Sequence, residues 1–119
     1  MLKIATGATK PGQGWEVYFA QPVDNCLKIH VDTSSAGFTA TPHYTASLCA
    51  NKGWHWSTVG ASNIYAATEK GFDLYIGWRG VKITDAFPMK DASGAAVAQT
   101  FLELAQKMEW YIQWTGVET

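Results

Sequence analysis

The chain has 119 residues, of which 47% are hydrophobic, 16% are charged and 13% are aromatic, and its formal net charge at pH 7 is −1. This length predicts a single domain over residues 1–119, because most domains contain roughly 100 to 200 residues. The scattered lysines and arginines argue against a nucleic-acid partner. The lack of a signal-peptide core, or of an apolar segment near the ~20 residues that cross a bilayer, predicts a soluble chain without a membrane span.

Alternating segments in the first half of the chain predict β-strands. Residues 2–6 alternate apolar and polar side chains, residues 15–20 resume an extended pattern, and residues 26–32 alternate most clearly. In residues 26–32, the apolar side chains of Leu27, Ile29 and Val31 share one face of the expected strand. The alternation resumes after Pro42, where Tyr44, Ala46 and Leu48 share a face. We therefore expect strands with one buried side and one solvent-facing side.

The second half predicts further strands and one helix. Residues 57–65 indicate a short irregular strand or a turn, whereas residues 72–79 alternate strictly. Residues 94–108 carry an apolar stripe at helical spacing, formed by Val97, Ala98, Phe101, Leu104, Ala105 and Met108. We expect this helix to pack on the sheets rather than to bind a partner or a membrane surface.

The last expected strand, residues 109–115, places Trp110, Ile112 and Trp114 on one face. Two indoles on one face are a large apolar load for a small domain, so we expect this strand to lie centrally in the core. The whole pattern predicts a mainly all-β fold, an antiparallel sandwich of about six to eight short strands with one inserted helix near residues 94–108.

The two cysteines, Cys26 and Cys49, lie on separate expected strands and lack the spacing of a metal site. A disulfide would form only if these strands were neighbours with their Cβ atoms facing each other. The sequence favours two free thiols over this disulfide, because free cysteine is commonly a small buried apolar residue.

Catalytic chemistry has no positive support in the sequence. The strongest arrangement is a metal site made by His30, Asp32 and His43, of which only the first two are placed on one face by the strand period. We favour the alternative that both histidines lie on a solvated sheet face. We therefore predict a protein that is not an enzyme and has no metal or cofactor.

Ligand binding is better supported, by an aromatic segment around residues 53–56. Indole faces stack on the C–H faces of sugars, and nearby polar groups bond the hydroxyls. Asn51 lies close by, and Trp78 and Arg79 end the alternating strand. The sequence therefore predicts a ligand-binding set of Trp54, His55, Trp56, Trp78 and Arg79, with core packing as the alternative for Trp56 and Trp78.

Three segments resemble the H-type lectin pattern. Residues 37–48 carry a Phe and then a Pro before a strand ending in Ser-Leu, residues 71–80 carry a Gly-Phe strand that leads to Trp78, and residues 110–117 close the pattern with Trp114. The resemblance implies a six-stranded antiparallel sandwich that forms a homotrimer and binds N-acetylgalactosamine-type sugars between protomers. The chain departs from the pattern through the helical insertion at residues 90–108. It also has Arg79-Gly80 where a small residue and an aspartate are expected.

These observations predict a non-catalytic, lectin-type carbohydrate-binding module whose partners are glycans and which becomes multivalent through oligomerisation. The alternative is a structural or assembly module, such as a phage-tail or surface-particle subunit, in which the aromatic segment contacts other protein chains.

Overall fold

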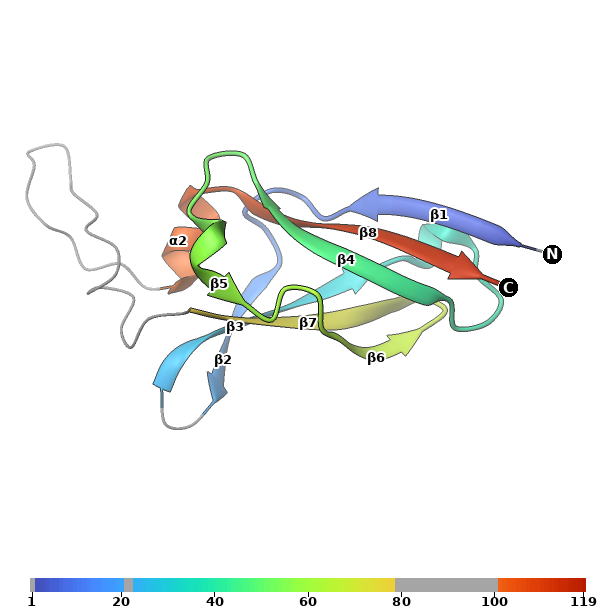
Figure 1. Cartoon of the computed structure of the whole chain (residues 1–119), viewed down its shortest axis with the longest axis horizontal. Helices are drawn as coiled ribbons and strands as arrows, with labels where there is room; N and C mark the ends of the chain where they lie inside the picture. The colour runs from blue at the N-terminus through green and yellow to red at the C-terminus, as the bar shows by residue number, and fades with distance from the viewer. Residues whose placement is uncertain (1, 21–22, 79–100) are drawn as a thin grey trace, which may run out of the picture.

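The computed structural model describes residues 2–20, 23–78 and 101–119. Figure 1 shows two antiparallel sheets packed face to face, with one helix at an end of the sandwich. The eight strands of the described part are β1 (Lys3–Ala8), β2 (Trp15–Ala20), β3 (Val23–Asp32), β4 (His43–Ala50), β5 (Thr58–Val59), β6 (Ile64–Thr68), β7 (Gly71–Trp78) and β8 (Trp110–Glu118). The predicted all-β sandwich is confirmed.

The first sheet has the order β1-β8-β4, so β8 is its central strand. The side chains of Trp110, Ile112 and Trp114 point into the core and are at most 6% exposed. The predicted central position of this strand is therefore confirmed. It follows from the apolar face alone, because two indoles in a small domain need packing partners from both neighbouring strands and from the opposite sheet.

The second sheet has the order β2-β3-β7-β5, and β6 also pairs with β7. Its inner face carries the apolar residues that the period-two pattern identified, which are Leu27, Ile29 and Val31 from β3 and Phe72, Leu74 and Ile76 from β7. Each is at most 2% exposed. β3 begins at Val23, three residues before the expected start at Cys26. The added residues extend its pairing with β2, where Ala20 is opposite Val23.

The largest apolar residue of strand β1, Ile4, faces solvent rather than the core. Leu2 and Ile4 are each 60% exposed, whereas Ala5 packs against the core cluster. The next inward position is Gly7, which lies opposite Trp114, and a Cβ atom there would come within 2.7 Å of the indole Cζ2. The indole of Trp114 therefore occupies the space that a side chain at residue 7 would fill.

Helix α2 (Phe101–Lys107) covers one end of the sandwich and contacts β2, β3 and β8. Phe101, Leu104 and Ala105 are buried, which confirms the prediction that the apolar stripe packs on the sheets. Residues 94–100 of the expected helix, including Val97 and Ala98, lie outside the described residues. Nor does the described part contain a helix long and apolar enough to cross a membrane.

The segment from residue 55 to residue 68 is irregular, and it includes residues 57–65, for which a short irregular strand or a turn was expected. A 3-10 turn, η2 (His55–Ser57), leads into β5, which is only two residues long. In β6, Ala66 has φ 52°, and the register with β7 shifts between Tyr65 and Thr68. A residue in this conformation breaks the strand period, which is why the sequence pattern is weak here.

A polar bridge joins the two sheets at Tyr44 of β4. The Tyr44 hydroxyl donates to the carbonyl oxygen of Thr68 at 2.7 Å, so it accepts from the Oγ1 of Thr33 at 2.6 Å. Thr33 is completely buried and follows β3 directly, before the 3-10 turn η1 (Ser34–Ala36). The bridge thus satisfies a buried hydroxyl and connects three segments that are distant in sequence.

Candidate functional site

The loop that carries the predicted binding residues connects β4 to η2 and is tied to the start of β8. The backbone N–H groups of Asn51 and Lys52 donate to the carbonyl oxygens of Glu109 and Met108 at 3.2 and 3.1 Å. The Nε1 of Trp110 donates to the carbonyl oxygen of Gly53 at 2.8 Å. Because Trp110 is completely buried, the loop is fixed to the core immediately before Trp54.

The structure places both indoles of this loop at the surface. Trp54 is 37% exposed and Trp56 is 64% exposed. Trp54 also has φ 68°, a left-handed conformation that bulky residues rarely adopt. The core-packing alternative for Trp56 is thus not what the structure shows.

His55 lies between the two indoles and is half-buried. Its carbonyl oxygen accepts a hydrogen bond of 2.8 Å from the Oγ1 of Thr58. Its Nδ1 is buried and has no hydrogen-bond partner among the described residues. A buried polar atom of this kind is uncommon in a folded protein and calls for a structural or functional reason.

The remaining two predicted residues are only partly placed. The backbone of Trp78 pairs with Thr58 of β5, two residues after Trp56, so β5 brings this loop beside the end of β7. Nothing is described of the Trp78 side chain, and Arg79 lies outside the described residues. The structure therefore brings together Trp54, His55, Trp56 and the backbone of Trp78.

A second aromatic group, which the sequence interpretation missed, lies on the outer face of the second sheet. Tyr75 of β7 packs edge-on against Tyr18 of β2 and Tyr65 of β6, with ring centroids 4.9 and 5.1 Å apart. The three rings border a cleft of about 480 Å³, the tyrosine cleft, which is also lined by Cys26 and Asn63. The outward position of Tyr75 follows from strand alternation, but the assembly of three tyrosines depends on strand order and register.

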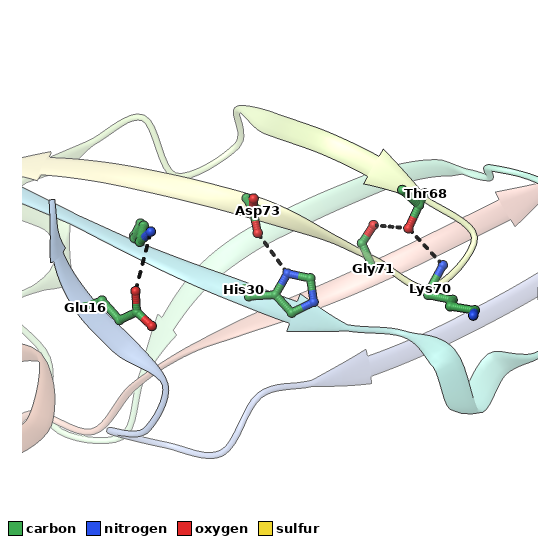
Figure 2. Close-up of polar contacts among 7 residues, drawn as sticks. Glu16, His30, Thr68, Lys70, Gly71 and Asp73 are labelled. Atoms are coloured by element: carbon green, nitrogen blue, oxygen red, sulfur yellow. Dashed lines mark hydrogen bonds and ion pairs between the residues drawn. The ribbon is translucent and has the colours of Figure 1, made fainter.

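Two ion pairs lie on the same outer face. Figure 2 shows His30 of β3 reaching across to Asp73 of β7, with 2.8 Å between Nδ1 and Oδ1. Lys28 is 3.5 Å from Glu16 of β2. Both pairs join neighbouring strands and are solvent-accessible, so each contributes little to stability.

The alternative metal set is not assembled. His30 bonds Asp73 rather than acting with Asp32, and His43 begins β4 in the other sheet. The Asp32 carboxylate instead accepts from the backbone N–H of Ser34 at 2.9 Å, and hydrogen bonding from Ser34 lowers the pKa of Asp32. Within residues 2–20, 23–78 and 101–119, no three His, Cys, Asp or Glu side chains form a group suited to a metal ion.

The two cysteines lie in different sheets, with Cys26 on β3 and Cys49 on β4, and both are thiols. Cys26 lines the tyrosine cleft of the second sheet. In the first sheet, the Sγ of Cys49 is 3.6 Å from the Oε1 of Gln113. The two thiols therefore lie on opposite outer faces of the sandwich.

Comparison with known proteins gave no match to a family model, to a curated protein or to a solved structure. The resemblance to H-type lectins thus stays a prediction from the sequence.

Proposed function

We propose that this protein is a non-catalytic, lectin-type carbohydrate-binding module in which a sugar ring stacks on the indoles of Trp54 and Trp56. The observation that carries the proposal is the left-handed backbone of Trp54, φ 68°, in a loop anchored to the core. Indoles combine a flat apolar face with an N–H donor, which matches the C–H faces and hydroxyl groups of a pyranose.

The left-handed backbone conformation of Trp54 supports a functional role because it destabilises the fold. A non-glycine residue in the left-handed region costs on the order of 1–3 kcal/mol, which glycine would avoid. The indole remains 37% exposed, so its burial does not compensate for this cost in full. Strained residues of this type concentrate at ligand-binding positions.

The sugar class and the assembly state follow from the H-type lectin resemblance. It implies a homotrimer that binds N-acetylgalactosamine-type sugars, and a trimer would strengthen a shallow, weak site through simultaneous engagement of several sugars. The anchored loop supports this proposal because a rigid site loses less entropy on binding. Trp78 and Arg79 remain proposed contributors.

A glycan array followed by titration calorimetry with N-acetylgalactosamine tests the proposal. We expect wild-type protein to bind, and Trp54→Gly and Trp56→Ala each to weaken binding about five- to thirtyfold, since loss of one stacking ring costs roughly 1–2 kcal/mol. Tyr111→Ala, on the outer face of the first sheet, is the matched aromatic control and should bind normally. Absence of any bound glycan, or equal binding by all four proteins, would refute the proposal.

A specific observation favours the assembly alternative as a second function. Ile4 of β1 and Leu2 immediately before this strand are each 60% exposed, and β1 is an edge strand of the first sheet. Exposed apolar residues on an edge strand favour pairing with another chain. In this function, β1 would add a strand of a protein partner.

Light scattering of wild type and Ile4→Lys tests this second function. Assembly through β1 predicts an oligomer that dissociates in Ile4→Lys, because a charge on an edge strand blocks pairing. Thr6→Lys, on the same face of β1, should dissociate the oligomer as well, because it also adds a charge to this edge. A monomeric wild type would contradict both the trimer and the assembly role.

A further inference from the structure

The floor of the tyrosine cleft is one row of residues that crosses four strands. In the ladder, Tyr18 is opposite Cys26, Cys26 is opposite Gly77, and Gly77 is opposite Val59. The two central positions of the row are small, whereas Tyr18 and Val59 stand at its ends. The cleft exists because small residues lie between larger ones on neighbouring strands.

The walls rise beside this row. Tyr75 is two residues before Gly77 on β7, and its ring is held between the rings of Tyr18 and Tyr65. Asn63, in the turn that joins β5 to β6, also lines the cleft. Tyr18 and Tyr65 are 43% and 53% exposed, so ring surface is available at the rim. The result is an aromatic wall with phenol and amide groups.

The described lining of the cleft is uncharged. None of the described residues that line it carries a charged side chain. Among the described residues of the same face, Lys28 is paired with Glu16, and Asp73 is bonded by His30. The described lining therefore offers no charged partner to an anion or a cation.

We infer that this cleft is a second sugar site, which binds a neutral pyranose ring on the face of the tyrosine group. A volume of about 480 Å³ falls within the roughly 300–1,000 Å³ typical of small-molecule sites. Apolar ring faces beside a few fixed polar groups are the combination that a pyranose requires. The choice of a sugar over another neutral ring rests on the proposed function, although the cleft and its neutrality are separate observations.

Protection of Cys26 from alkylation tests this inference in the full-length chain. Cys49→Ser leaves Cys26 as the reporter of the cleft, and Cys26→Ser leaves Cys49 as the reporter of the other sheet. Iodoacetamide labelling is followed by mass spectrometry in the presence of galactose, glucose or N-acetylgalactosamine. Glucuronate serves as the charged probe, and phenol serves as the ring that is not a sugar.

We expect at least one neutral sugar, at ten times its Kd, to slow Cys26 labelling about tenfold and to leave Cys49 labelling unchanged. Glucuronate should protect less than glucose, because none of the described lining residues supplies a cation for its carboxylate. Tyr65→Ala and Asn63→Ala should each remove most of the protection, whereas Tyr111→Ala should retain it. Asn63 and Tyr65 are both exposed, so their alanine variants should fold.

Three results would overturn the inference: no slowing by any neutral sugar, equal slowing of both thiols, or slowing by phenol alone. Its failure is distinguishable from failure of the proposed function, which is measured at Trp54 and Trp56. If glycan binding depends on those indoles and Cys26 stays unprotected, only the cleft assignment fails. If sugars protect Cys26 while Trp54→Gly binds glycans normally, only the loop assignment fails.

Discussion

The Nε1 of buried Trp110 donates a 2.8 Å hydrogen bond to the carbonyl oxygen of Gly53. One residue of the central strand thus fixes the backbone directly before the exposed indole of Trp54. Trp110 also packs edge-on against Phe101 of the helix and against Trp15 of β2. The position of the proposed sugar-binding loop therefore depends on the core of the sandwich and on the helix end.

Trp110→Phe should loosen this loop. The substitution retains an aromatic ring but removes the N–H donor, and we expect a loss of about 2 kcal/mol in the free energy of unfolding. Hydrogen exchange should become faster in residues 51–57. Trp15→Phe is the matched control, because it removes a buried indole donor that bonds the Trp110 carbonyl oxygen at 3.0 Å. Equal exchange in the two variants would show that the bond to Gly53 does not hold the loop.

Trp54→Gly should be more stable than Trp54→Ala by about 1 kcal/mol. Glycine adopts φ 68° without strain, whereas alanine keeps the cost of the left-handed conformation. Urea denaturation of both variants measures the difference. An alanine variant as stable as the glycine variant would mean that the loop relaxes to another conformation.

Tyr44→Phe should lower the free energy of unfolding by about 1–3 kcal/mol, because it leaves the buried hydroxyl of Thr33 and the carbonyl oxygen of Thr68 without their partner. The ring itself keeps its contact with Phe72, at a centroid distance of 4.6 Å. Thermal and urea unfolding provide the measurement. Tyr111→Phe, on the outer sheet face, should change stability by less than about 0.5 kcal/mol, and a similar loss in both variants would argue against the bridge.

Glu118 should contribute stability that depends on pH. Its carboxylate accepts from the backbone N–H of Ala40 at 2.6 Å and of Thr39 at 2.8 Å, and these bonds lower its pKa. A carboxyl group with a lowered folded-state pKa stabilises the fold above its unfolded pKa, and this contribution is lost as the pH falls through the folded pKa. Wild type should therefore exceed Glu118→Gln in stability at neutral pH.

The stability difference between wild type and Glu118→Gln should narrow once the pH falls below the ordinary range of a glutamate pKa. Urea unfolding across this acidic range measures it. Glu103→Gln, at an exposed position of the helix, serves as the comparison. A gap that stays constant with pH would contradict the role of the carboxylate charge.

The strands that could be predicted from the sequence are those whose side chains alternate without interruption. The inner faces of β3, β7 and β8 follow from this period, because burial on one side of a sheet imposes it locally. β1 shows the limit of the rule, since its exposed Ile4 follows from the fit of Gly7 beneath Trp114 on another strand. Such a pairing depends on register, which a single segment does not contain.

The candidate site was likewise predictable where its residues are neighbours in sequence, and not where they come from different strands. The exposed indoles were identified because they are concentrated in one loop, where neighbours in sequence are neighbours in space. The tyrosine cleft was missed because Tyr18 and Tyr65 both pack on Tyr75 only through the order in which their strands lie in the sheet. The left-handed backbone at Trp54 was likewise not predictable, since glycine is the residue expected in that conformation.

The antiparallel pairing of β1 with β8 places Lys3 opposite Glu118, and Figure 1 shows the two chain ends side by side, away from β5. Strand β8 separates Glu118 from Trp110 by about 27 Å, at ~3.4 Å for each residue. A tether attached at either end would therefore hold the molecule with the loop that carries Trp54 and Trp56 at the end of β8 far from the support. Beads coated in this way would present a uniformly oriented layer.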